Sequence, residues 1–186
     1  MAHRFDPKKA HKLDNPARRK LLPPEEILAP LAIGGRDDVA DIGVGLGYFA
    51  IPAAKMTRGT VYGVDVEPQM LGLLKTKAAE AGVVNIEPIL SDAENISLPD
   101  ASVDKVFCSL VLHELANLEK GLAEIRRILR PGGKLLVLEW EKKETESGPP
   151  VEERIDAMDL ETGIQAFGFL TRVIRPNPNH YIILGE

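Results

Sequence analysis

Three aspartates stand where short apolar runs of the sequence end, and their carboxylates offer the clearest chemistry in the chain. They are Asp41, Asp65 and Asp92. Open α/β sheets bind ligands beyond the carboxyl ends of their strands. A carboxylate there can accept hydrogen bonds from both hydroxyls of a ribose. Another carboxylate can accept a hydrogen bond from an exocyclic amine such as that of adenine. A single loop carboxylate is usually only solvated, but three at successive strand ends indicate a site for a nucleoside.

A glycine-rich stretch directly follows the first of these aspartates. Gly43, Gly45 and Gly47 alternate with apolar residues, and residues 50–55 then have the spacing of a helix. Glycine reaches backbone angles closed to other residues and has no Cβ, so a ligand can lie against the backbone. The start of the helix suits a carboxylate or a phosphate. A glycine-rich turn also occurs without a ligand, so this stretch alone predicts only a strand, a tight turn and a helix.

The chain around these residues alternates between strands and helices. The patterns predict strands over 39–41, 60–65, 85–91, 103–110 and 135–140, and helices over 24–31, 50–55, 68–81 and 118–129. Residues 130–133 read as the turn that ends the last of these helices, and Pro88 predicts an edge position for its strand. This alternation predicts an α/β fold, a doubly wound parallel sheet with helices on both sides.

The end of the chain breaks the alternation. A helix is expected over 152–167, followed by two strands over 169–175 and 180–185. The turn between these strands, residues 176–179, is too short for a parallel crossover, which needs about a dozen residues. We therefore expect the last strand to enter the sheet in reverse.

Composition and charge narrow the class of protein. The 186 residues are 44% hydrophobic and 27% charged, as in an ordinary globular domain. No apolar run is long enough to span a bilayer, and the first residues lack the apolar core of a signal peptide, so we expect a cytoplasmic location. The single cysteine, Cys108, lies in an apolar run and is expected to be buried. We expect no disulfide and no metal site.

The first 23 residues form a basic arm, and residues 24–186 form the domain proper. Seven Lys and Arg against two Asp and Glu occur within residues 1–24, whereas the whole chain carries a net charge of −5. One interpretation of the arm is a solvated leader with a turn or two of helix. The other is a lid that folds over the site, excludes water and attracts an anionic acceptor through His11, Lys12, Arg18 and Arg19.

Taken together, four motifs resemble those of class I S-adenosylmethionine-dependent methyltransferases, and the resemblance covers residues 24–186. Residues 109–115, SLVLHEL, and the LRPGG turn resemble the group around the ubiquinone and menaquinone biosynthesis methyltransferases. The four motifs are Asp41–Gly47, Tyr62–Asp65, Asp92–Ala93 and Leu129–Leu135.

The resemblance implies a Rossmann-like sheet of seven strands, mostly parallel, in the order 3-2-1-4-5-7-6 with strand 7 antiparallel. It implies S-adenosylmethionine as cofactor and S-adenosylhomocysteine as product. We expect His113 to lie near the methyl group, either as a general base, which its ordinary pKa near 6.5 suits, or as a structural residue. The expected cofactor-binding residues are Asp41, Gly43, Gly45, Gly47, Asp65, Val66, Asp92, Ala93, Ser109 and Leu110.

The expected reaction is transfer of a methyl group to a small-molecule acceptor by in-line displacement, which depends mainly on positioning. The tetrapeptide of Asn-Pro-Pro-Tyr type, used by many methyltransferases of nucleic acids and proteins, is missing from the sequence, so we expect no nucleic-acid partner. The loop over residues 141–150 is short, which favours a small acceptor or a homo-oligomer whose second subunit completes the site. Two alternatives stay open, an NAD-dependent oxidoreductase and a non-catalytic cofactor-binding module.

Overall fold

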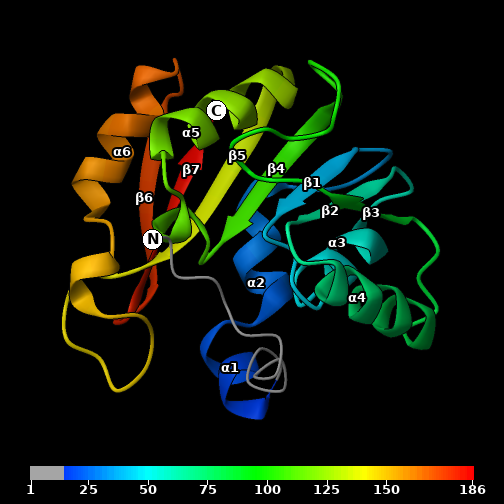
Figure 1. Cartoon of the computed structure of the whole chain (residues 1–186), viewed down its shortest axis with the longest axis horizontal. Helices are drawn as coiled ribbons and strands as arrows, with labels where there is room; N and C mark the ends of the chain where they lie inside the picture. The colour runs from blue at the N-terminus through cyan, green and yellow to red at the C-terminus, as the bar shows by residue number, and fades with distance from the viewer. Residues whose placement is uncertain (1–14) are drawn as a thin grey trace.

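A seven-stranded sheet organises the part of the chain that the computed structural model describes, residues 15–186 (Figure 1). The strand order is β3-β2-β1-β4-β5-β7-β6, and β7 is antiparallel to both of its neighbours. The predicted order and the reversed last strand are therefore confirmed. Pro88 lies on β3, which is an edge strand as its proline predicted. The strands are β1 (Val39–Ile42), β2 (Val61–Asp65), β3 (Ile86–Leu90), β4 (Val103–Ser109), β5 (Leu129–Trp140), β6 (Thr171–Asn177) and β7 (His180–Gly185).

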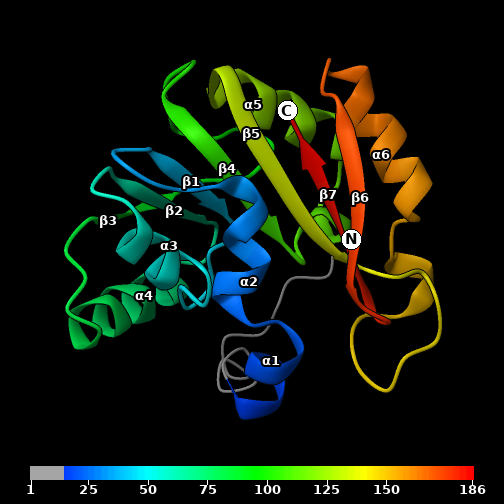
Figure 2. The ribbon, with the colours of Figure 1, turned by 180° about the vertical axis from the view of Figure 1, so that it is seen from behind.

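Helices cover both faces of the sheet, as Figures 1 and 2 show from opposite sides. One core cluster joins the sheet to α2, α3 and α4, and the other joins it to α5 and α6. The short α1 buries none of its side chains and lies beyond the carboxyl ends of the strands. The α-helices are α1 (Pro16–Leu21), α2 (Pro24–Leu28), α3 (Ala50–Met56), α4 (Pro68–Glu80), α5 (Leu118–Ile128) and α6 (Ala157–Ala166); the 3-10 turns are η2 (Ala29–Leu31), η3 (Leu112–Glu114) and η4 (Val151–Glu153).

The LRPGG segment differs from its prediction as a turn between helix and strand. Helix α5 ends at Ile128 and the chain enters β5 directly, so this segment belongs to the strand. Leu129 pairs with Val103, whereas Lys134 pairs with Lys105. The four residues between Leu129 and Lys134 are therefore accommodated as an irregularity within the ladder, which a glycine at φ +77° (Gly132) makes possible.

The predicted helix over 152–167 begins later than expected. Asp156 caps α6 by accepting a hydrogen bond from the amide of Met158 at 2.9 Å, and the backbone of Arg154 is extended. The first residues of the predicted helix instead form the separate turn η4. The capping carboxylate therefore sets the start of α6.

Within residues 15–186, no helix is long and apolar enough to cross a membrane.

Candidate active site

The glycine turn between β1 and α3 brings backbone to the carboxyl edge of the sheet. Gly43, Gly45 and Gly47 all have positive φ angles, of 74°, 52° and 80°. The amides of Gly43 and Val44 both donate to the carbonyl of Val64 at 2.9 Å, and the amide of Gly47 donates to that of Val44. The turn therefore has few free amide donors, and Val111 and Leu74 already pack where a Cβ of Gly43 or of Gly47 would stand.

Asp41 and Asp65 are a pair of acids beside this turn. Oδ2 of Asp65 accepts from the amide of Gly45 at 2.9 Å, and its Oδ1 accepts from the amide of Glu67 at 2.9 Å. Asp41 is 4% exposed. Burial and the charge of Asp65 raise the pKa of Asp41 to about 8, although the amide of Ala50 opposes this shift. Burial likewise raises the pKa of Asp65, although the hydrogen bonds from the amides of Glu67 and Gly45 act in the opposite direction.

Three more of the predicted cofactor-binding residues lie at the ends of β2 and β3. Asp92 is exposed, and its Oδ1 accepts from the amide of Glu94 at 2.8 Å. Ala93 is buried in the core, and Val66 is an exposed apolar residue. These positions border the same edge of the sheet as Asp65, so the structure brings the predicted cofactor residues to one edge.

The end of β4 contains a strained residue. Leu110 has φ +57°, and its amide donates to the carbonyl of Leu138 at 2.8 Å. A positive φ at a residue other than glycine costs about 1–3 kcal/mol and is typical of functional sites. Oγ of the preceding Ser109 is buried and has no hydrogen-bond partner among the described residues.

His113 forms a dyad with Glu139, a residue that the sequence interpretation missed. Nδ1 of His113 lies 2.9 Å from Oε2 and 3.1 Å from Oε1 of Glu139. Oε1 also accepts from the amide of Leu112 at 3.0 Å. Both side chains are almost completely buried. A carboxylate at Nδ1 holds the proton on that nitrogen and leaves Nε2 as the basic atom.

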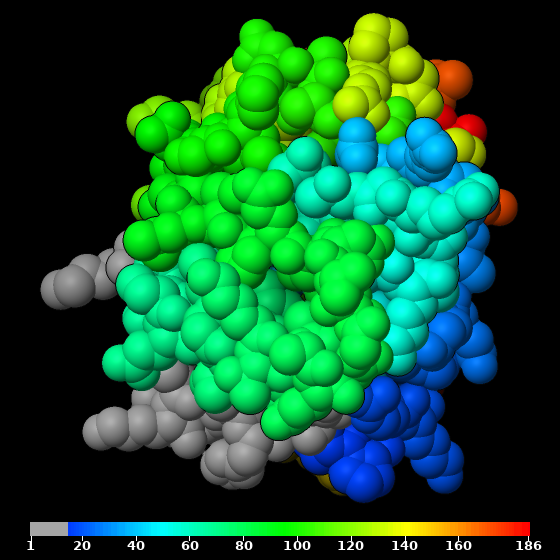
Figure 3. Space-filling view, turned by 90° about the vertical axis from the view of Figure 1, so that its right-hand side faces the viewer, coloured from blue at the N-terminus to red at the C-terminus, as the bar shows by residue number. Residues whose placement is uncertain are grey.

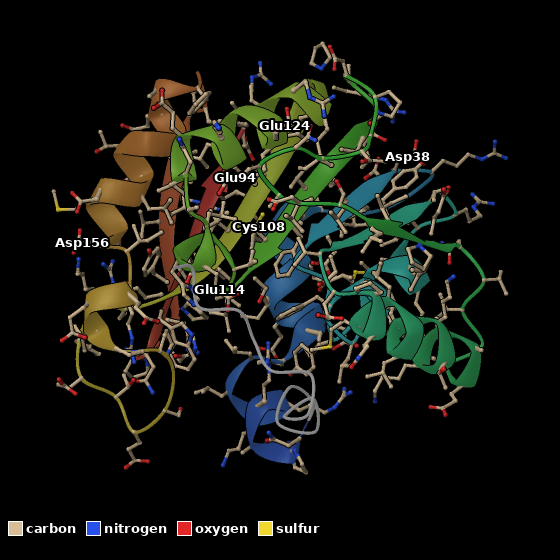
Figure 4. The ribbon with its side chains drawn as sticks, viewed as in Figure 1. Asp38, Glu94, Cys108, Glu114, Glu124 and Asp156 are labelled. Atoms are coloured by element: carbon tan, nitrogen blue, oxygen red, sulfur yellow. The ribbon has the colours of Figure 1, made fainter. Side chains whose placement is uncertain are left out.

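The charge state of this dyad is set by opposing effects. Burial alone would lower the pKa of His113, but the hydrogen bond and the charge of Glu139 outweigh burial, so the pKa is raised. Glu114 and Glu153 add smaller contributions in the same direction. Figure 4 shows Glu114 beyond the carboxyl end of β4 and Asp38 at the opposite edge of the sheet.

A second histidine lies across the end of β5. His180 is fully buried and pairs in register with Trp140, whose ring centre is 4.2 Å from its own. Its Nδ1 is 2.9 Å from Oδ1 of Asn177. Burial and the nearby charges of Arg18 and Arg154 lower the pKa of His180 to about 4. The ring is therefore neutral at neutral pH.

Arg154 organises the loop that connects β5 to α6. It is 4% exposed, and its guanidinium lies over the ring of Trp140. All three of its nitrogens donate hydrogen bonds into the loop, to the carbonyls of residues 141, 143, 147 and 149 and to Oγ1 of Thr145. One buried side chain thus holds most of the loop over residues 141–150 in place.

The described part of the basic arm is docked against this edge. Tyr48, next to the glycine turn, donates from its hydroxyl to the carbonyl of Leu22 at 2.8 Å, and Nδ2 of Asn177 donates to the carbonyl of Leu21 at 3.0 Å. The guanidinium groups of Arg18 and Arg19 lie over the Tyr48 ring. Two further predicted lid residues, His11 and Lys12, lie outside the described residues. The boundary between arm and domain remains a prediction.

Three other features of the described residues lie outside this arrangement of acids and histidines. No group of three or more His, Cys, Asp or Glu within residues 15–186 could hold a metal ion. Cys108 is fully buried, as predicted, and its burial raises the pKa of its thiol. A groove between α4 and β3, lined by Lys75, Gly82 and Pro88 among others, lies on the side shown in Figure 3, away from the acids described above.

The missed residues did leave some signal in the sequence. Glu139 is a charged residue directly after the apolar run 135–138, and such a residue in a buried strand requires a partner. His180 opens the last strand, and its neighbours, the ring of Trp140 and the charge of Arg18 on α1, come from distant parts of the chain. Only the first of these signals could have been found without the structure.

Comparison with known proteins places this site in a family. A family model described as a methyltransferase domain matches residues 40–137, more than half of the chain. The chain is 31% identical over 165 residues to the ubiquinone/menaquinone biosynthesis C-methyltransferase UbiE of Francisella tularensis subsp. novicida (strain U112). This match includes 87% of the chain but only 63% of that relative, so the chain spans less than two thirds of its length.

Two further relatives agree with this assignment. The demethylmenaquinone methyltransferase of Deinococcus radiodurans is 39% identical over 103 residues, which is 55% of this chain and 42% of that protein. A crystal structure of a SAM dependent methyltransferase from Aquifex aeolicus superposes with a TM-score of 0.91 at 31% identity and covers 98% of both chains. Its shared fold and the match of the family model mean that this chain belongs to the methyltransferase domain family.

Proposed function

We propose that this protein binds S-adenosylmethionine and catalyses transfer of its methyl group to a small-molecule acceptor. The observation that carries this proposal is the acid pair Asp41 and Asp65 beside the glycine turn, at the carboxyl edge of a seven-stranded sheet of methyltransferase order. S-adenosylmethionine supplies a methyl group on a positively charged sulfur, and it also carries an ammonium group. Buried acids suit a ligand with these charges.

The same acids argue against a nicotinamide dinucleotide. The pyrophosphate of NAD is anionic and would lie beside the charge of Asp65, which already raises the pKa of the neighbouring Asp41. The amides of Gly43 and Gly47, which could cradle a phosphate, already donate to the carbonyls of Val64 on β2 and of Val44. The site therefore favours a cationic ligand over a dinucleotide.

The predicted residues divide the cofactor between them. Asp65 keeps one free lone pair on each oxygen after accepting two amides, which is enough to accept both ribose hydroxyls. Asp41 and the glycine turn take the methionyl end, next to Ser109 and Leu110. The adenine lies between the ends of β2 and β3, against Val66 and Ala93 and with its amine toward Asp92.

His113 acts as the general base for an acceptor that arrives protonated. Its Nδ1 keeps its own proton and donates it in a hydrogen bond to the Glu139 carboxylate. Nε2 takes the proton that the acceptor loses as its new bond to the methyl group forms and the carbon–sulfur bond breaks. The raised pKa of His113 makes it the stronger base but keeps it protonated to a higher pH. The ubiquinone/menaquinone biosynthesis and demethylmenaquinone methyltransferases among the relatives suggest a quinone-type acceptor, so quinones and their reduced hydroquinones are the first class to test.

The test combines binding with turnover. Calorimetry should show binding of S-adenosylhomocysteine and none of NAD, and mass spectrometry should detect a methylated product from S-adenosylmethionine and naphthalene-1,4-diol. His113→Ala should lower kcat by about 10²–10⁴-fold without changing cofactor affinity. Glu139→Gln should shift the rising limb of the pH–rate profile to lower pH, because the contribution that raises the His113 pKa is lost.

Two results would contradict the proposal. Tighter binding of NAD than of S-adenosylhomocysteine would support the oxidoreductase alternative. Cofactor binding without turnover, over a broad panel of hydroxylated aromatic acceptors, would support a non-catalytic module. Cytoplasmic location and a homo-oligomer stay predictions, which cell fractionation and light scattering can check.

A further inference from the structure

A long loop, residues 91–102, connects β3 to β4 and lies along α5. Near the start of the loop, Oε1 of Glu94 accepts a hydrogen bond from the amide of Asn117, the residue that caps α5, at 2.8 Å. Near its end, the amide of Ala101 donates to the carbonyl of Arg127 at 2.9 Å. Figure 4 shows Glu94 beside α5. The helix therefore holds the loop at both ends.

Arg127 on α5 binds the middle of this loop with its whole guanidinium group. Nη1 donates to the carbonyl of Leu98 at 2.8 Å and to Oδ1 of Asp100 at 2.7 Å. Nη2 donates to the carbonyl of Ile96 at 2.8 Å. Nε and Nη2 also donate to the two carboxylate oxygens of Glu124, at 2.8 and 2.7 Å. These five hydrogen bonds use all five N–H groups of an arginine side chain.

Glu124, one helical turn before Arg127, completes the hold on Ile96. Its Oε2 accepts from the amide of Ile96 at 2.7 Å, while the carbonyl of the same residue accepts from Arg127. Both backbone groups of Ile96 are therefore bound to one ion pair on the helix. The hydrogen bonds from Arg127 outweigh burial and lower the pKa of Glu124, so this carboxylate is ionised at neutral pH. The side chain of Ile96 is also buried in the core.

The hydroxyl of Ser91 connects Ile96 to the neighbouring Asp92. Oγ of Ser91 donates to the carbonyl of Asn95 at 2.8 Å and accepts from the amide of Ser97 at 2.9 Å. These two bonds join the residues on either side of Ile96 to the residue that precedes Asp92. A movement of Ile96 would therefore also move Asp92.

We propose that Arg127, together with Glu124, is a positioning residue that holds the Asp92 carboxylate in place for the exocyclic amine of adenine. This inference rests on the proposed function, which places that amine at Asp92. The side chain of Asp92 is exposed, and its Oδ1 accepts from the amide of Glu94, so its orientation depends on the backbone of the loop. A carboxylate fixed in this way accepts a hydrogen bond from an amine and repels a carbonyl oxygen in the same place. The hold of α5 on the loop therefore gives selectivity for adenine over hypoxanthine.

Calorimetry with S-adenosylhomocysteine and S-inosylhomocysteine measures this selectivity without any turnover. The second compound has a carbonyl oxygen in place of the amine. The wild type should prefer the first by about tenfold or more, because the site rejects a ligand that leaves the carboxylate unpaired. Arg127→Lys keeps the positive charge but cannot supply five donors in one plane, and should reduce the ratio of the two affinities about fivefold. A ratio near one in the wild type would overturn the role of Asp92 and the inference with it.

The matched control is the neighbouring residue on α5, Arg126. Its guanidinium lies over the ring of Phe169, 5.3 Å from the ring centre. Arg126→Lys makes the same chemical change on the same helix, but should leave the affinity ratio as in the wild type. An equal loss of selectivity in both variants would contradict a specific role for Arg127.

A double-mutant cycle separates positioning from general support of the fold. Asp92→Ala should lose the selectivity by itself, and Arg127→Lys should then change the affinity ratio no further, because the carboxylate through which Arg127 acts is gone. An unchanged ratio in Arg127→Lys alone, or the same fivefold loss in the Asp92→Ala background, would overturn the inference and leave the proposed function standing. Loss of S-adenosylhomocysteine binding by the wild type would refute the proposed function itself.

Hydrogen exchange on the wild type provides a second measurement, which decides the question even if Arg127→Lys does not fold. The amide of Ile96 lies in a loop but should exchange slowly, because it donates to Glu124. S-adenosylhomocysteine should slow this exchange more than S-inosylhomocysteine does at equal saturation. Exchange of the Ile96 amide as fast as in an unstructured peptide, or equal slowing by the two compounds, would overturn the inference.

Discussion

Replacing Asp41 by asparagine removes a carboxylate that the fold keeps protonated. The side chain is 4% exposed, and burial together with the charge of Asp65 raises its pKa from 3.8 to about 8. The folded protein therefore holds a proton at Asp41 that the unfolded chain releases. This contribution to stability is fully present below pH 3.8 and is lost as the pH rises to about 8.

The expected magnitude follows from the linkage between protons and folding. The free energy of unfolding of the wild type should fall by up to about 1.4 kcal/mol for each pH unit between these limits, through this group alone. In Asp41→Asn the free energy of unfolding should fall less steeply with pH over the same interval, by that amount for each pH unit. Denaturant titrations at several pH values in this range measure how the free energy of unfolding changes with pH. The wild type and Asp41→Asn are measured side by side, so that their difference reports on Asp41 alone.

Cofactor binding should reverse the preference of Asp41 for its neutral form. The positive groups of S-adenosylmethionine favour the carboxylate, so binding at pH 6–7 should release close to one proton from the wild type. Calorimetry in two buffers of different ionisation enthalpy counts these protons. Asp41→Asn should release about one proton fewer, and the difference should vanish near pH 9, where Asp41 is already ionised. Equal proton counts for the two proteins at pH 6.5 would refute the placement of the cationic end at Asp41.

Three further substitutions test other parts of the site. Asp65→Ala should weaken S-adenosylhomocysteine binding at least tenfold in calorimetry, because each lost hydrogen bond to a charged group is worth about 1.5–3 kcal/mol; an unchanged affinity would exclude the ribose role. Gly47→Ala should lower the free energy of unfolding, measured in urea, by about 2–5 kcal/mol, because the φ of Gly47 is +80° and a Cβ there would collide with Leu74. The matched control is Gly72→Ala, where the space for a Cβ is open. This control should stabilise α4 by up to about 1 kcal/mol. Arg154→Lys should lower the unfolding free energy by about 3 kcal/mol and speed proteolysis of loop 141–150, because a single ammonium cannot replace a guanidinium that donates five hydrogen bonds; equal cleavage rates would contradict this role.

The strands and the reversed last strand could be predicted because their signals are local, whereas the strand order followed from the resemblance to a known family. The glycine turn after Asp41, the aspartates at successive strand ends and the short hairpin at residues 176–179 each act over a few residues. The exact extent of β5 could not be predicted in the same way. Pro131 and the two glycines after it normally end a helix with a turn, but pairing of Leu129 with Val103 absorbs them into the sheet.

The dyad and the second histidine illustrate what a sequence does not contain. Glu139 is 26 residues from His113, and their contact depends on the register between β4 and β5. The low pKa of His180 comes first from burial and then from the charges of Arg18 on α1 and of Arg154, and no sequence periodicity indicates these neighbours. The roles of these residues depend on contacts between distant parts of the chain. The residue types alone therefore could not decide whether His113 is catalytic or structural.

The attachment of α1 also has a consequence for folding kinetics. Its two anchors are Tyr48 and Asn177, which lie 26 and 156 residues away from their carbonyl partners, Leu22 and Leu21. Both anchors must be in place before the segment can dock, and the second exists only once the C-terminal hairpin has paired. A segment without buried side chains that depends on such distant contacts should be the last to form and the first to open. Amide hydrogens of α1 should therefore exchange by local opening, well before those of β5, while the rest of the molecule stays folded.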